Sequence, residues 1–137
     1  MIVCLDTNIL ISGAARPDST PGSLVLGFLD GAFTLVTSEY QLDEFARVSR
    51  YPRMKKFLKP TRAGYLMNKL RARAVIVEPG ERLDVSPDPD DNVIISVAVA
   101  GNAQLLVSGD EQHVIALKKV GSVRIVTAAQ AVALLKL

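Results

Sequence analysis

The chain has 137 residues, of which 49% are hydrophobic and 22% charged, and this size and composition indicate one ordinary globular domain spanning residues 1–137 rather than a disordered chain. No run approaches the roughly 20 apolar residues of a membrane span, and the N-terminus lacks the basic start of a signal peptide, so we expect a cytoplasmic protein without membrane contact. One histidine and one cysteine exclude a zinc site built from these ligands, and any metal must be held by oxygen.

Strand-like and helix-like segments alternate along the chain, which predicts an α/β fold with a mainly parallel sheet of about five strands. The only cysteine, Cys4, lies inside the first strand, where we expect it to act as a small buried hydrophobic residue. The predicted strands are Met1–Leu5, Phe33–Thr37, Val75–Val77, Leu105–Ser108 and Val123–Val126.

Capping signals predict where the helices begin and end. A short helix is expected from Thr7 to about Ser12, and a second from Thr20 as N-cap and Pro21 as first residue to the Gly31 stop. Two capping-box patterns open further helices; the first of these runs to about Arg50, and the basic stretch is expected to continue after it as helical pieces. These signals are Ser38 with Gln41, Thr127 with Gln130, the breaks at Pro52 and Pro60, and the stripe Leu66, Leu70 and Ala74.

The segment Val93–Ala100 is ambiguous, because its β-branched residues would suit a buried strand. Its flanks favour a helix: Asp88 can be an N-cap with Pro89 as first residue, and Gly101-Asn102 supplies a left-handed stop. We therefore predict a buried helix packed on the sheet.

Net charge is only +2, yet the charges are strongly segregated. From Arg47 to Arg73 the chain carries ten bases and no acid, so the other six bases and all fourteen acids lie elsewhere. A basic stretch interleaved with aromatic residues is typical of a nucleic-acid surface, although a solvated helical face remains the alternative. The bases we assign to nucleic-acid binding are Arg47, Arg50, Arg53, Lys55, Lys56, Lys59 and Arg62.

Acidic residues come from four separate segments that reach one edge of the predicted sheet. Ligands of open parallel sheets bind beyond the carboxyl ends of the strands. Asp6 directly follows the first strand and Asp110 follows the fourth across Ser108-Gly109. The helices supply two further pairs, Asp43 with Glu44 and Asp90 with Asp91.

Helix geometry separates the members of each pair. Glu44 borders the inward stripe of its helix, whereas Asp43 points outward with Arg47 four residues on. Asp91 leans toward the core, and Asp90 toward the rim. Taken singly, each acid has a structural alternative, since Asp6 could cap the first helix and Asp91 could complete a capping arrangement.

Several converging carboxylates would repel one another without a cation, and the cations that prefer oxygen ligands are Mg²⁺ or Mn²⁺. Small polar neighbours suit supporting roles, namely Thr7, Asn8, Ser38 and Ser108. One or two such ions beside a basic surface favour hydrolysis of a phosphodiester, in which they polarise the phosphate, activate water and stabilise the leaving oxygen.

Four motifs, in this order and spacing, resemble the PIN-domain family, in particular its prokaryotic VapC-like toxin nucleases. They are LDTNILIS at 5–12, SEYQLDEF at 38–45, DPDDNVIISVAVAGNA at 88–103 and LLVSGD at 105–110, and the resemblance covers essentially the whole chain. It implies a three-layer α/β/α fold, Mg²⁺- or Mn²⁺-dependent cleavage of RNA, commonly a homodimer, and often an antitoxin partner. Carried over by position, the acidic site falls on Asp6, Glu44, Asp91 and Asp110, supported by Asn8, Ser38 and Ser108.

The chain departs from the family after Asp110, where relatives often carry a further acid and this sequence continues Glu111-Gln112-His113. Glu111 or Asp90 could substitute as a ligand. The alternatives to a toxin ribonuclease are an RNA-binding module without catalysis and a housekeeping nuclease without antitoxin. A phosphatase would need a second acid where Asn8 stands, and a phosphoacceptor would need a lysine after the last strand.

Overall fold

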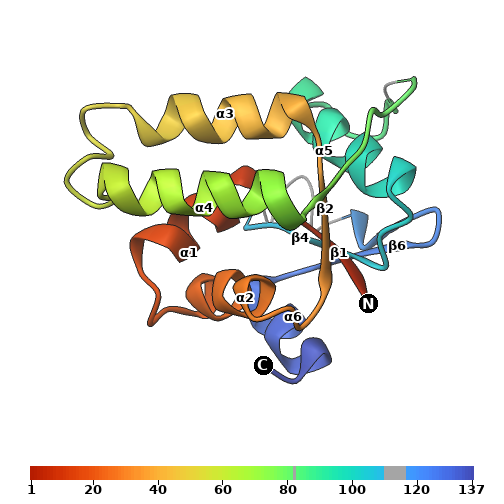
Figure 1. Cartoon of the computed structure of the whole chain (residues 1–137). Helices are drawn as coiled ribbons and strands as arrows, with labels where there is room; N and C mark the ends of the chain where they lie inside the picture. Colours follow the sequence, from red (N-terminus) through yellow and green to blue (C-terminus); the bar gives the residue numbers. More distant parts are fainter. Residues whose placement is uncertain (82, 110–116) are drawn as a thin grey trace.

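The computed structural model describes residues 1–81, 83–109 and 117–137, and these residues form one six-stranded sheet in the order β3-β2-β1-β4-β6-β5 (Figure 1). All neighbouring strands pair in parallel except the antiparallel hairpin of β5 and β6. The strands are β1 (Ile2–Leu5), β2 (Thr34–Thr37), β3 (Val75–Ile76), β4 (Leu105–Val107), β5 (Lys119–Val120) and β6 (Val123–Val126).

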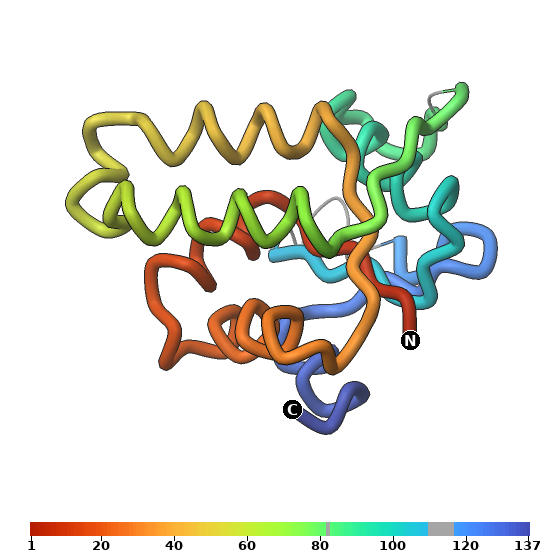
Figure 2. The backbone as a smooth tube through the Cα atoms, viewed as in Figure 1, coloured from red at the N-terminus to blue at the C-terminus, as the bar shows by residue number. Residues whose placement is uncertain are grey.

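Helices cover both faces of the sheet, as the three-layer expectation requires (Figure 2). Alternate residues of β1 point to opposite faces, so Val3 and Leu5 join the core beneath five helices and Cys4 joins the core beneath α5. The helices are α1 (Thr7–Ala15), α2 (Thr20–Leu29), α3 (Glu39–Ser49), α4 (Pro60–Arg73), α5 (Pro89–Ala100) and α6 (Ala128–Leu135). The α/β class and the mainly parallel sheet are confirmed.

The strand β5 was not expected from the sequence. It has two residues and forms a hairpin with β6 through Gly121, whose φ of 59° is in the left-handed region. So short a strand has no periodicity of its own, and only its pairing with Val123 and Arg124 of β6 defines it.

Two helix starts and ends differ from those expected. The helix α1 continues past Ser12 to Ala15, where the Arg62 guanidinium donates to the Ala14 and Ala15 carbonyls, 3.4 Å from each. The N-cap of α2 is Ser19, whose hydroxyl accepts from the Gly22 amide, so Thr20 is inside the helix rather than capping it.

The basic stretch contains one long helix rather than several helical pieces. Residues 50–58 form turns, and α4 then begins at Pro60, where the fixed φ of proline suits the first turn. Leu66 and Leu70 of the predicted stripe are buried, with Ala74 packed against the same core.

The ambiguous segment 93–100 is helical, as its flanks indicated. Asp88 caps α5 by accepting from the Asp90 amide at 2.9 Å, and Asn102 takes the left-handed conformation that follows the helix. This helix alone covers its face of the sheet in the described part of the chain, so Ile95, Val97 and Ala98 are all buried against strands.

The strand order determines where a ligand can bind. From β1 the chain moves to β2 and β3 on one side, and β4 then pairs with the other side of β1, so the crossover direction reverses between β1 and β4. A crevice opens at such a point, outside the carboxyl ends of the strands. Asp6 and Ser108 directly follow these two strands. None of the helices in the described ranges is long and apolar enough to cross a membrane.

Candidate functional site

An acidic pocket of about 240 Å³ lies at the carboxyl edge of the sheet. Three separate elements contribute acids to it: the start of α1, the first half of α3 and the start of α5. Its lining is Asp6, Thr7, Asn8, Ser38, Tyr40, Gln41, Glu44, Val48, Asp88, Asp90, Asp91, Val93, Ile94 and Val97. Three of the four acids singled out from the sequence therefore line one cavity.

Asp6 occupies the N-cap position of α1, but its carboxylate does not cap the helix. Its main chain performs that role, because the Asp6 carbonyl accepts from the Ile9 and Leu10 amides. The side chain turns toward β4 instead, where its Oδ2 accepts from the Ser108 hydroxyl at 3.2 Å. The capping alternative thus applies to the backbone of Asp6 and leaves its carboxylate to the pocket.

The environment of Asp6 disfavours its charged form. The pKa of its carboxyl is raised to about 6, chiefly by burial and further by the charges of Glu44 and Asp91, while hydrogen bonds from the Ser108 hydroxyl and the Thr7 amide partly oppose the increase. Glu44 and Asp91 act on Asp6 although they belong to different helices, so the three acids share one electrostatic environment.

Glu44 projects from the pocket-facing side of α3 and is held there by a hydrogen bond from α1. Thr7 is a buried residue, and its hydroxyl donates to Glu44 Oε1. Its neighbour Asp43 is exposed and lines a different hollow with Arg47 and Arg50. The helix-wheel argument therefore separated these two acids correctly.

Asp91 is buried, and the Ser86 hydroxyl donates to its Oδ2 at 3.0 Å. The next residue, Asn92, anchors the same loop: its side chain accepts from the Val85 and Ser86 amides and donates to the Ser86 carbonyl. Sequence analysis missed both Ser86 and Asn92. The available signal was an asparagine placed among apolar residues of a helix predicted to be buried.

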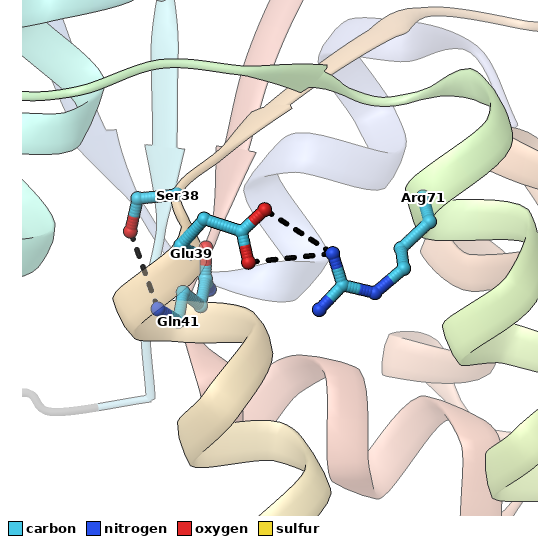
Figure 3. Close-up of polar contacts among 4 residues, drawn as sticks. All are labelled: Ser38, Glu39, Gln41 and Arg71. Carbon is cyan, nitrogen blue, oxygen red and sulfur yellow. Dashed lines mark hydrogen bonds and ion pairs between the residues drawn. The ribbon is translucent and has the colours of Figure 1, made fainter.

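Asp90 is exposed at the rim of the pocket, where the sequence placed it. Of the other supporting residues, Asn8 is exposed and lines the pocket, Ser108 bonds to Asp6, and Ser38 caps α3 by accepting from the Gln41 amide at 3.2 Å (Figure 3). The predicted site residue Asp110 lies outside the described residues, as do Glu111 and His113.

The pocket lining matches the chemistry of a hard divalent cation. Its donors are carboxylate, hydroxyl and amide oxygens, which Mg²⁺ and Mn²⁺ prefer, and a cation would offset the repulsion that raises the pKa of Asp6. Within the described ranges, however, no three acidic, histidine or cysteine side chains are gathered closely enough to hold a metal ion. Mg²⁺ is commonly held by one or two carboxylates and completes its coordination with water, so the pocket acids fit such an ion without a cluster of three.

The basic stretch begins near the end of α3, passes through the turns that follow it, and returns along α4 toward the start of α3. The helices α3 and α4 lie antiparallel, and the turns joining them are at the opposite end of α3 from α5 (Figure 1). All seven bases assigned to nucleic acid are exposed. Arg62, however, also closes the end of α1, and two bases outside that set bind protein: Arg71 pairs with Glu39 at 3.1 Å (Figure 3), and Arg73 donates to the Leu29 carbonyl.

The structure is an α/β domain with acids that converge at the switch point of its sheet, and comparison with known proteins defines its class. Residues 2–112 match the family model described as PIN domain, and the chain belongs to this family. PIN domains are typically metal-dependent nucleases and generally use Mg²⁺.

Two individual proteins are similar to this chain. An uncharacterized protein from Methanocaldococcus jannaschii is 28% identical over 110 residues, which cover 80% of this chain and 70% of the relative. Among solved structures, VapBC2 from Rickettsia felis, bound to a DNA fragment from their promoter, matches with a TM-score of 0.58 at 18% identity. That match covers 93% of this chain and 98% of the other, and at this identity it shows the shared fold.

Proposed function

We propose that this protein is a metal-dependent endoribonuclease that hydrolyses RNA phosphodiester bonds with Mg²⁺ or Mn²⁺. The observation that carries the proposal is the acidic pocket, in which α1, α3 and α5 each deliver a carboxylate to the carboxyl edge of the sheet. Membership of the PIN-domain family supports the nuclease class.

We assign the metal to Asp6, Glu44, Asp91 and Asp110. When bound, the cation neutralises charge on the scissile phosphate and lowers the pKa of water. The chain's own groups hold the carboxylates ready: Ser108 orients Asp6, Thr7 orients Glu44 and Ser86 orients Asp91. The side chains of Asn8 and Asp90 are exposed at the rim of the pocket, where they can contact the RNA or the water around the metal.

The RNA extends in this proposal from the pocket along the outer side of α3 to the turns beyond it. Arg47 and Arg50 lie one and two turns after Glu44, so a backbone leaving the pocket meets positive charge within about 9 Å along the helix. Arg53, Lys55, Lys56 and Lys59 continue the basic surface and are exposed. Arg62 is the weakest member of the set, because its guanidinium is already bonded to α1.

We further propose that the protein is the toxin of a toxin–antitoxin pair and forms a homodimer. The fold shared with VapBC2 over nearly the whole of both chains supports the toxin assignment, and the homodimer is proposed from the resemblance to the family. Affinity purification from the native host, followed by mass spectrometry and a Mn²⁺-dependent cleavage assay, tests it. A small co-purifying protein that blocks cleavage is the expected result, and active nuclease recovered without such a protein would instead indicate a housekeeping enzyme.

The nuclease activity is tested with a matched pair of substitutions on α3. Glu44→Gln removes a pocket carboxylate, whereas Asp43→Asn removes the neighbouring acid that faces another hollow. We expect Glu44→Gln to reduce Mn²⁺-dependent cleavage of total RNA by at least about 100-fold, because a metal ligand is lost, and Asp43→Asn to leave it within about two-fold.

Cleavage by the wild type that persists in excess EDTA would contradict the metal-dependent mechanism. An RNA affinity that survives substitution of all the pocket acids, with no cleavage under any divalent metal, would favour the alternative of a non-catalytic RNA-binding module.

A further inference from the structure

The side chain of Gln41 is buried in the wall of the acidic pocket, with only 2% of the residue exposed. Its Oε1 accepts from the Thr37 hydroxyl at 2.6 Å, and its Nε2 donates to the Leu5 carbonyl. The sequence pattern suggested that this glutamine would return to its own helix start in a capping box. Its carboxamide instead reaches two strands.

Both strand partners lie at the last residue of their strands. Leu5 ends β1 and directly precedes Asp6, and Thr37 ends β2 and directly precedes Ser38. The register between β1 and β2 extends only to Cys4 opposite Val36. The Gln41 side chain therefore links β1 and β2 just beyond their paired residues, at the edge where the pocket opens.

The same residue fixes the start of α3. Its backbone amide donates to the Ser38 hydroxyl, while Glu39 in the same turn is paired with Arg71 of α4 (Figure 3). Glu44 follows Gln41 by three residues, so it projects from nearly the same side of the helix, about 4.5 Å further along the axis. The hydrogen bonds of Gln41 thus connect the helix that carries Glu44 to the strand end that precedes Asp6.

We propose that Gln41 is a positioning residue that sets the separation of Asp6 and Glu44, so that both carboxylates can hold one divalent cation. This inference rests on the proposed function. Gln41 acts through its neighbours, because both ends of its carboxamide are bonded to protein. Its effect on a metal should resemble that of other residues that orient ligands, which change affinity or activity by about 10- to 100-fold.

The test compares three variants by Mn²⁺ binding and by cleavage. Gln41→Met keeps the length of the side chain and removes both hydrogen bonds, and Thr37→Val removes only the bond to Oε1. Gln130→Met is the matched control, because Gln130 occupies the equivalent third position of α6 and its side chain bonds to its own helix start.

We expect Gln41→Met to raise the dissociation constant for Mn²⁺, measured by electron paramagnetic resonance or calorimetry, by about 10-fold or more. Its kcat for RNA cleavage should fall while KM for RNA stays unchanged, because the basic surface is intact. Thr37→Val should show a smaller change in the same direction, and Gln130→Met none. Circular dichroism establishes that each variant is folded at the temperature used.

A lowered melting temperature with wild-type Mn²⁺ affinity and kcat would show that Gln41 is merely structural and would overturn the inference. Should Gln41→Met fail to fold, Thr37→Val decides the question by the same two readouts. If the wild type itself neither binds Mn²⁺ nor cleaves RNA, the proposed function has failed, whereas a competent wild type matched by both variants refutes the role of Gln41 alone.

Discussion

At the scale of single residues, the position of Asp6 at the edge of the sheet disfavours the ionised form of its carboxyl. The carboxylate sits at the end of a buried strand, near two other acids, and the Ser108 hydroxyl and the Thr7 amide favour its ionised form. Carboxyl groups with a perturbed pKa are typical of functional sites. Cys4, two residues before it, is unlike Asp6, because burial raises the pKa of its thiol and keeps it an inert part of the core, as the sequence predicted.

The raised pKa of Asp6 predicts how stability varies with pH in metal-free protein. The folded state binds this proton more tightly than the unfolded chain, so the contribution of Asp6 is fully present below pH 3.8 and is lost as pH rises through about 6. Chemical denaturation in EDTA should show the free energy of unfolding of wild type falling relative to Asp6→Asn by about 3 kcal/mol across this window.

Adding Mg²⁺ should oppose this loss, because the cation binds the ionised carboxylate of the folded state and not the unfolded chain. A difference between wild type and Asp6→Asn that stays constant from pH 4 to 7 in EDTA would contradict the buried, repelled state of this carboxyl.

At the scale of elements, α5 and the loop before it are one unit. Asn92 makes three hydrogen bonds of 2.8–3.0 Å to Val85 and Ser86, and the Ser96 hydroxyl accepts from the Leu83 amide. The Ser86 hydroxyl of this loop donates to Asp91, so the geometry of the pocket depends on polar contacts made by a segment outside the regular helices and strands.

Asn92→Ala should therefore destabilise the protein by about 3 kcal/mol, because it leaves buried backbone groups of Ser86 without partners. The measurement is denaturant unfolding, together with hydrogen exchange at the Val85 and Ser86 amides, which should lose protection. Asn68→Ala in the exposed face of α4 is the control and should change stability by less than about 0.5 kcal/mol. Equal effects at the two asparagines would show that the loop is not held in this way.

At the scale of the whole molecule, charge is divided between the acidic pocket and the helical hairpin of α3 and α4. Some bases of the stretch are engaged within the fold, namely Arg62, Arg71 and Arg73, so fewer are available to a ligand than the sequence suggested. The turns between the helices hold exposed bases together with Tyr51, over whose ring Arg53 lies at 5.6 Å.

Replacing Lys55 and Lys56 with Gln should weaken RNA binding and lower its dependence on salt. Each phosphate contact to single-stranded RNA contributes about 0.7 to the slope of log affinity against log salt, so the double variant should lose about 1.4. Lys119→Gln with Arg124→Gln removes the same charge from the β5–β6 hairpin and is the matched control. Identical slopes for both double variants would mean that net charge, and not this surface, governs binding.

Local sequence signals were sufficient for much of the fold. Alternation of apolar strands with capped helices identified the α/β class, and the proline and asparagine around 88–102 distinguished a buried helix from a strand. Local signals misjudged elements defined by distant partners. The Arg62 guanidinium bonds to the last turn of α1. That helix also needs glycine at position 13, because a Cβ there would lie 2.5 Å from the Val25 side chain of α2.

The sequence by itself determined which acids follow strands and which helix face each one occupies, because these depend on periods of two and 3.6 residues. It therefore placed Asp6, Glu44 and Asp91 on the side where they line one pocket. Only the tertiary structure decided which polar groups hold them there. The bonds of Gln41 to Leu5, Ser108 to Asp6 and Thr7 to Glu44 join residues far apart in the chain, and such contacts arise from strand order and packing, which no local pattern encodes.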